Sequence, residues 1–90
     1  MAFQLLYHHE VRADIARINE KLKTRIRKAI ETRLAVAPQQ YGEPLRKTLK
    51  GYWKMRVGDY RIVFKITGNE ILILAILHRK TVYESIPKRR

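Results

Sequence analysis

The fold of this chain is decided by residues 52–64, YWKMRVGDYRIVF. Apolar residues alternate with polar and basic ones on both sides of its centre, the period-two pattern of strands with one buried face. Gly58-Asp59 interrupts the alternation and predicts a two-residue turn. A loop of two residues sets the register, so Arg56 is expected directly opposite Arg61. The stretch therefore predicts an antiparallel hairpin.

One face of this hairpin is predicted to be cationic. The register puts Lys54, Arg56 and Arg61 on one side and Trp53 on the other, with the core. Like charges directly opposite each other destabilise a strand pair by up to about 1 kcal/mol. We therefore expect an anion on this face, and a phosphate is the anion that the pattern favours.

Composition limits the class of protein. The chain has 90 residues, enough for one small domain spanning 1–90, and a net charge of +12. The excess is concentrated, because residues 45–65 carry seven basic and one acidic side chain, and residues 78–90 carry five and one. Such a field favours a polyanionic partner, nucleic acid first and an acidic protein second. No basic segment has a long apolar face, so a membrane surface is not expected as partner.

Several sites and locations are not expected. There is no cysteine, so neither a disulfide scaffold nor a thiolate metal site can form. His8-His9 lack other ligand-type residues at useful spacing, so we predict no metal and no cofactor. No signal-peptide pattern follows Met1, and the longest apolar run, Ile71 to Leu77, is too short to cross a bilayer. A cytoplasmic protein is expected.

The remaining patterns predict an α+β fold. A short strand covers about residues 3–7, and an apolar stripe with helical spacing runs from Val11 to Leu34, with a break expected at Asn19-Glu20. Residues 38–44 resemble a loop. A turn at 67–70 leads to a strand at 71–77, apolar on both faces and so expected inside the sheet. The predicted order is β-α-α-β-β-β, a mostly antiparallel sheet with two helices on its Trp53 face, followed by a mobile basic tail, Lys88-Arg89-Arg90.

The second turn predicts how the last strand pairs. If Ile66 pairs with Ile71, Arg61 faces Ile76, and His78 falls on the face of Arg61, diagonal to it. This register would add an imidazole to the cationic face.

Two motifs resemble a known family. They are the hairpin Lys54-x-Arg56-x-Gly58-x-Tyr60-Arg61-Ile62-Val63-Phe64 and, after an apolar strand, His78-Arg79-Lys80-Thr81-Val82-Tyr83. Both resemble the RelE/ParE superfamily of toxins from toxin–antitoxin pairs, as do the element order and the length. The resemblance implies a RelE-like fold and a toxin of the RelE branch, which cuts mRNA in the ribosomal A site without a metal. It also implies a cognate antitoxin, which we expect to be acidic.

The resemblance assigns roles to some residues. Metal-free cleavage uses the 2′-hydroxyl of the RNA as nucleophile, so the protein must supply a base, charge stabilisation and an acid. Lys54 matches the family's base candidate, Arg61 its phosphate-binding arginine, and Tyr83 its base-stacking aromatic. Two positions depart from the family: Tyr52 stands where a second lysine is common, and Leu77 where relatives carry an arginine. Tyr52 is then a candidate contact to ribose or base.

The proton donor is left open. Arg79 could cover the role of the missing arginine, but His78 is the better acid on chemical grounds because an imidazole titrates near neutrality. Each of these residues also has an alternative role that is purely structural. In that alternative Lys54 is a solvated lysine, Arg61 an ion-paired arginine, His78 a residue that caps the strand end, and Tyr83 an aromatic packed under a C-terminal turn. Arg56 either binds substrate or only supports the site.

A basic stripe on the second helix is a further candidate. Lys21, Arg25 and Lys28 either contact ribosomal RNA phosphates or form a solvated helix face. Other functions also fit the chain: a ParE-like inhibitor of DNA gyrase without catalysis, a basic nucleic-acid-binding module without toxicity, or a degenerate toxin that only binds its partner.

Overall fold

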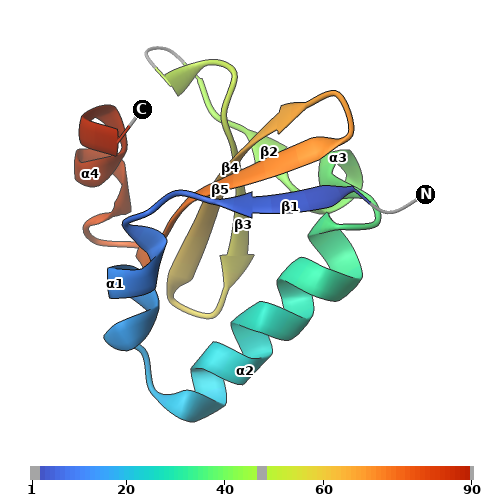
Figure 1. The fold of residues 1–90 in the computed structure, drawn as a ribbon. Helices are drawn as coiled ribbons and strands as arrows, with labels where there is room; N and C mark the ends of the chain where they lie inside the picture. Colours follow the sequence, from blue (N-terminus) through green and yellow to red (C-terminus); the bar gives the residue numbers. More distant parts are fainter. Residues whose placement is uncertain (1–2, 47–48, 90) are drawn as a thin grey trace.

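The computed structural model describes residues 3–46 and 49–89 and confirms the α+β class (Figure 1). A five-stranded sheet has the order β1-β5-β4-β3-β2, in which only the β1–β5 pair is parallel. The elements are β1 (Gln4–Tyr7), α1 (Val11–Ala16), α2 (Glu20–Ala29), the π-helix η1 (Ile30–Leu34), α3 (Pro38–Tyr41), β2 (Glu43–Pro44), β3 (Trp53–Val57), β4 (Tyr60–Thr67), β5 (Glu70–His78) and α4 (Val82–Arg89).

The predicted hairpin is confirmed residue by residue. Strands β3 and β4 pair with Arg56 opposite Arg61 and Lys54 opposite Val63. Gly58 has a φ of +60°, in the left-handed region that this tight turn requires. Glycine adopts this conformation readily because it has no Cβ. The two-residue loop therefore determined the register, as expected.

The predicted register of the last strand is wrong beyond its middle. Ile66 does pair with Ile71, but the pairing shifts between Val63 and Phe64, so that Arg61 faces Leu77 and His78 faces Tyr60. The shift leaves one extra residue on β5. Because side chains alternate across a strand, a slip of one residue moves every later side chain to the other face.

The helical stripe forms as predicted and breaks at Asn19. The Asn19 side chain accepts a hydrogen bond from the Leu22 backbone N–H, which caps the start of α2. The stripe is buried against one face of the sheet, where Val11, Ile26 and Leu34 are at most 3% exposed. The segment expected to be a loop, residues 38–44, contains α3 and β2.

The C-terminus differs from the predicted mobile tail. Residues 82–89 form α4, which covers the sheet face opposite α1 and α2 (Figure 1). Val82 and Ile86 are fully buried against Val63, Leu74 and other residues of that face. Pro87 lies inside this helix, although proline removes a backbone donor there. Packing therefore outweighs the local preference; Arg90 lies outside the described residues.

A buried ion pair fastens α4 to α1. Asp14 accepts hydrogen bonds from both Nη atoms of Arg89, at 2.6 and 2.8 Å, and from the Ile76 backbone N–H at 3.1 Å. Arg89 also donates to the Leu74 carbonyl. β1 pairs with β5 only as far as Ile73. Asp14 and Arg89 thus provide hydrogen-bond partners for two backbone groups of β5 that β1 does not reach. Buried backbone groups need such partners.

None of the helices in the described ranges combines the length and apolar content needed to cross a bilayer.

Candidate functional site

Lys54 and Tyr83 lie together although 28 residues separate them in the chain. The Lys54 Nζ is 5.8 Å from the centroid of the Tyr83 ring, within the range of a cation–π contact. Strand β3 supplies the half-buried lysine, and the first turn of α4 supplies the tyrosine, which is 39% exposed. An aromatic surface and an amine therefore meet at a position that a ligand can reach.

Two arginines gather at the hairpin turn, and one of them, Arg61, shares the sheet face of Lys54. Arg61 Nη1 donates to the carbonyls of Gly58 and Tyr60, at 3.1 and 3.0 Å. Arg79 Nε lies 3.7 Å from the Asp59 carboxylate, and the Arg79 backbone N–H donates to the Asp59 carbonyl. Exposed pairs of this kind are weak. They orient the guanidinium groups while leaving further N–H donors of each for a ligand.

His78 does not join the cationic face, which corrects the sequence prediction. It lies opposite Tyr60 on the face that packs against the helices, and its ring makes an edge contact with the Tyr60 ring at 5.6 Å. Its Nδ1 accepts a hydrogen bond from the Lys80 backbone N–H. The register shift that removes His78 puts Leu77 and Arg79 on the side of Arg61, and Leu77 is buried there.

Lys65 is a residue of this face that sequence reasoning missed. Its Nζ lies 5.7 Å from the centroid of the half-buried Tyr52 ring. Relatives were expected to carry a lysine at the position of Tyr52, and here β4 supplies an amine beside it. The signal was available, because Lys65 follows Arg61 by four residues on the same strand and so shares its face.

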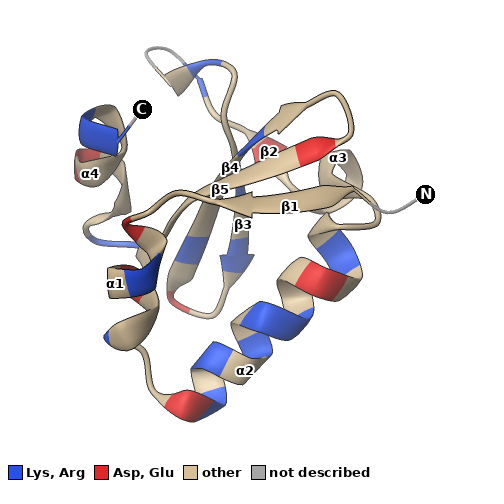
Figure 2. Ribbon diagram, in the orientation of Figure 1, with Lys and Arg blue, Asp and Glu red and all other residues tan. Residues whose placement is uncertain are grey.

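Arg56 lines a pocket with α2, and Arg61 is not among the residues that line this pocket. The pocket has a volume of about 200 Å³ and lies where Arg25 and Lys28 of α2 approach the end of β3. Lys21 is exposed near the start of α2 and does not line it. Figure 2 shows the basic residues of α2 and those near the hairpin turn in blue.

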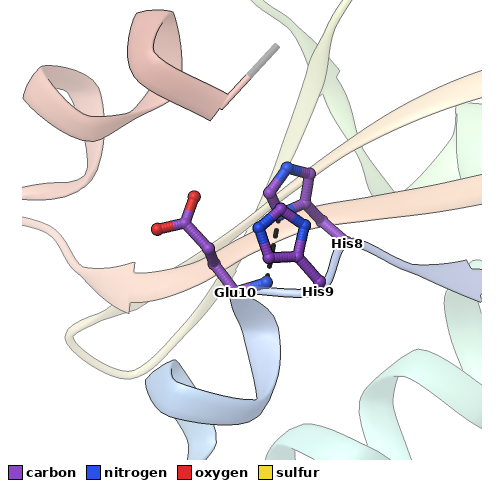
Figure 3. Close-up of side chains that lie close together, drawn as sticks. All are labelled: His8, His9 and Glu10. Carbon is purple, nitrogen blue, oxygen red and sulfur yellow. Dashed lines mark hydrogen bonds between the residues drawn. The ribbon is translucent and has the colours of Figure 1, made fainter.

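His8, His9 and Glu10 form the group within the described residues that could hold a metal ion (Figure 3). Their ligand atoms lie within 4.8 Å of one another, and Glu10 is the third donor that the sequence prediction did not count. Two of these donors have other partners: His8 Nδ1 accepts from the Glu10 backbone N–H, and the Glu10 carboxylate lies 3.6 Å from Arg89 Nε. We assign no metal to the cluster.

The cationic face, defined here by Lys54, Arg61, Lys65, Arg79, Tyr52 and Tyr83, suits a phosphodiester. Guanidinium groups donate in a fork that matches phosphate oxygens, and they remain charged. The aromatic rings offer surfaces on which bases stack. Its residues provide charge stabilisation and an amine, but neither a carboxylate nor an imidazole.

The known proteins to which this chain is similar in sequence are toxins. A family model described as ParE toxin of type II toxin–antitoxin system, parDE, matches residues 5–83. The chain is 32% identical over 89 residues to Toxin RelE of Mycobacterium tuberculosis, which covers 92% of both chains. It is 41% identical over 44 residues to Toxin RelE3 of Methanocaldococcus jannaschii, an alignment that spans 46% of this chain and half of that relative.

The fold also matches a solved structure. The toxin–antitoxin complex RelBE2 from Mycobacterium tuberculosis contains a chain that superposes with a TM-score of 0.82. The sequence identity is 23%, and the superposition covers 88% of this chain and all of that one. This likeness shows the same fold.

Proposed function

Because the chain belongs to the RelE/ParE superfamily of toxins from type II toxin–antitoxin systems, we propose that it cuts mRNA on the ribosome as a metal-independent endoribonuclease. The observation that carries the proposal is the contact between Lys54 and Tyr83. It lies on the sheet face that also carries Arg61, and Arg61 and Arg79 both have partners at the hairpin turn. An amine beside an accessible aromatic ring can contact a phosphodiester while the ring stacks on a base.

The residues act in the following order. A base of the message stacks on Tyr83, which sets the adjacent phosphate in line with the 2′-hydroxyl. Lys54 takes the hydroxyl proton, and Arg61 stabilises the charge that develops on the phosphorane oxygens. Arg79 donates a hydrogen bond that stabilises the departing 5′ oxygen, and this oxygen takes its proton from solvent water. The products are a 2′,3′-cyclic phosphate and a 5′-hydroxyl, and DNA survives because it lacks the nucleophile.

Lys65 and Tyr52 complete the substrate contacts. The amine of Lys65 supports the phosphate that follows the cleaved one, in place of the lysine that relatives carry at position 52. Among the residues that define this face, the Lys54 amine is the candidate base, and no imidazole competes with it for that role.

A cognate antitoxin is the proposed protein partner. The chain in the related complex RelBE2 is bound to an antitoxin. Here an apolar groove of about 710 Å³ lies between α1, α2 and the end of β1, with Val11, Ile15 and Ile26 among its walls and Arg12, Lys23 and Arg27 around them. An acidic amphipathic segment fits such a groove, because it offers both apolar and negative side chains.

A ParE-like gyrase inhibitor is the second candidate. The matching family model is described as ParE toxin, which favours it. Such a protein would block DNA gyrase without cutting RNA, and the cationic face would then have no catalytic role.

The deciding experiment is primer extension on mRNA from cells that express the chain alone. We expect discrete cuts inside codons of translated messages, and none in a reporter message whose start codon and ribosome-binding site have been removed so that it is not translated. Lys54→Ala with Arg61→Ala should abolish the cuts and the growth arrest, whereas Lys50→Ala with Lys80→Ala removes the same charge elsewhere and should preserve both. Intact messages with broken DNA would support the gyrase candidate and refute the nuclease.

A further inference from the structure

A second cationic site lies at the edge of the sheet, apart from the cationic face. It is the pocket of about 200 Å³ between α2, η1 and β3. We call it the edge pocket, and its walls are Arg25, Lys28, Ala29, Thr32, Arg33, Arg56 and Val57. None of these residues belongs to the cationic face that holds Lys54 and Tyr83.

The residues that line the edge pocket carry positive charge and include no carboxylate to neutralise it. Four of the seven lining residues are cations, and none is acidic. The carboxylates that form ion pairs in the described ranges, those of Glu10, Asp14, Glu20 and Asp59, all pair with other cations. Cations that converge in this way repel one another, and an anion among them reverses the sign of the interaction.

Three local features bring these cations together. β2 pairs with β3 only at Trp53 and Lys54, so the edge of β3 is open where Arg56 projects toward α2. At the hairpin turn, a Cβ added to Gly58 would lie 3.7 Å from Arg25 Nη1, so this guanidinium rests against the turn. The π-helix η1 follows α2 directly and carries Arg33 into the same pocket. Single π-turns of this kind occur often at functional sites.

The size and surroundings of the edge pocket select its ligand. Its volume is below the roughly 300 Å³ at which sites for drug-sized molecules begin, so a group of the size of a phosphate fits it better than a whole nucleotide. Arg33 lies over the ring of Tyr41, at 6.0 Å, and Tyr41 is 48% exposed. An exposed ring beside a cationic pocket is the combination with which proteins bind single-stranded nucleic acid, because the ring stacks on a base while the cations contact the backbone.

We propose that the edge pocket binds one backbone phosphate of RNA and anchors the chain at a point separate from the cationic face. The inference rests on the proposed function in one respect, the choice of RNA as the polyanion. Arg25, Arg33 and Arg56 donate to the phosphate oxygens, and Lys28 adds a point charge. The Thr32 hydroxyl donates to the Lys28 carbonyl at 2.6 Å, so its proton is already in use.

The test measures binding without cleavage. A fluorescent single-stranded oligoribonucleotide with 2′-O-methyl groups cannot be cut by 2′-hydroxyl attack, and its anisotropy is followed over a range of salt concentrations. Arg25→Gln with Arg33→Gln should weaken binding about tenfold and reduce the slope of log K against log salt by about 0.7, the contribution of one phosphate on a single strand. Arg17→Gln with Lys80→Gln removes two charges outside the pocket and should leave the slope unchanged. Matching thermal melts establish that the variants fold.

Equal losses for the two double variants would overturn the proposal, because the pocket would then contribute only to the general field. An NMR titration with inorganic phosphate gives a second measurement, in which the amides of Thr32, Arg33 and Gly58 should shift and saturate. Shifts that never saturate would also overturn it. If a polyglutamate peptide displaces the oligonucleotide in the wild type but not in the pocket variant, the site binds an acidic protein and the RNA assignment fails. None of these readouts depends on cleavage, so failure of the nuclease proposal would be seen separately.

Discussion

Replacing Asp14 by Asn tests whether one buried ion pair holds α4 on the sheet. The Asp14 side chain is 2% exposed and that of Arg89 is 10% exposed. Asparagine keeps the shape but loses the charge, and its NH₂ group would face the donors of Arg89. Arg89 would then lie buried against a neutral partner, with the Ile76 N–H competing for the remaining oxygen.

The expected cost is about 3 kcal/mol of unfolding free energy, the lower end of the roughly 3–5 kcal/mol measured when one partner of a buried pair is removed. The lower end applies because Arg89 also lies 3.6 Å from Glu10, which is 47% exposed and provides a partial substitute. In a domain of this size each kcal/mol moves the melting temperature by roughly 4–8 °C, so a drop of about 12–24 °C is expected.

The pH dependence of this contribution has a definite sign. The hydrogen bonds that Arg89 donates to Asp14 are the main cause that raises the pKa of Arg89 above its ordinary value. A raised pKa gives stability that is fully present below the unfolded-state value and is lost only as pH rises through the folded-state value. The folded-state and unfolded-state pKa values of Arg89 both lie far above neutrality. The contribution of Arg89 to stability therefore does not change with pH near neutrality.

Urea denaturation measures the free energy, and amide hydrogen exchange reports on α4. In Asp14→Asn the α4 amides should exchange faster than those of β4 and β5. Glu20→Gln is the matched control, since it breaks the exposed pair with Lys23 and should change stability by at most about 0.5 kcal/mol. A loss below about 1 kcal/mol in Asp14→Asn, with α4 exchange unchanged, would refute the claim that the pair holds this helix.

Three further predictions follow from single positions. A Cβ at Gly42 would lie 2.6 Å from Phe64 Cζ, so Gly42→Ala should lower the unfolding free energy by about 1–3 kcal/mol in urea denaturation, and an unchanged midpoint would contradict this. In the primer-extension assay Tyr83→Phe should keep cleavage, whereas Tyr83→Ala should lose about tenfold or more, the value of one stacked base; equal activities would argue against stacking. Burial, and then the charge of Glu31, raise the pKa of Tyr7, so its contribution to stability is lost as pH rises above about 10, and Tyr7→Phe should make melting temperatures less sensitive to alkaline pH; an unchanged pH dependence would exclude this cause.

Local sequence patterns that are compatible with only one structure were interpreted correctly. The Gly58-Asp59 turn permits one register, so the pairing of Arg56 with Arg61 followed from loop length alone. Asn19 was found as the helix break, where its side chain caps α2. The strand at 71–77 was placed inside the sheet because both its faces are apolar.

The same apolar strand explains the main error. When both faces of a strand are hydrophobic, the pattern does not specify which residue faces the helices, and a shift of one residue changes little in local preference. The extra residue in the middle of β5 is therefore invisible in the sequence. It exchanged His78 for Arg79 on the cationic face, and so removed the imidazole that had been the preferred acid.

By itself, the sequence determined the hairpin, the helical break and the cationic character of the face, because these depend on loop length, capping and alternation within a few residues. Only the tertiary structure decided that Tyr83 lies over Lys54 and that Arg56 joins Arg25 in a separate pocket. The contact of Tyr83 with Lys54 depends on α4, which forms despite Pro87 because Val82, Ile86 and Arg89 gain buried partners on distant elements. That gain comes from packing across the sheet, which local sequence patterns do not record.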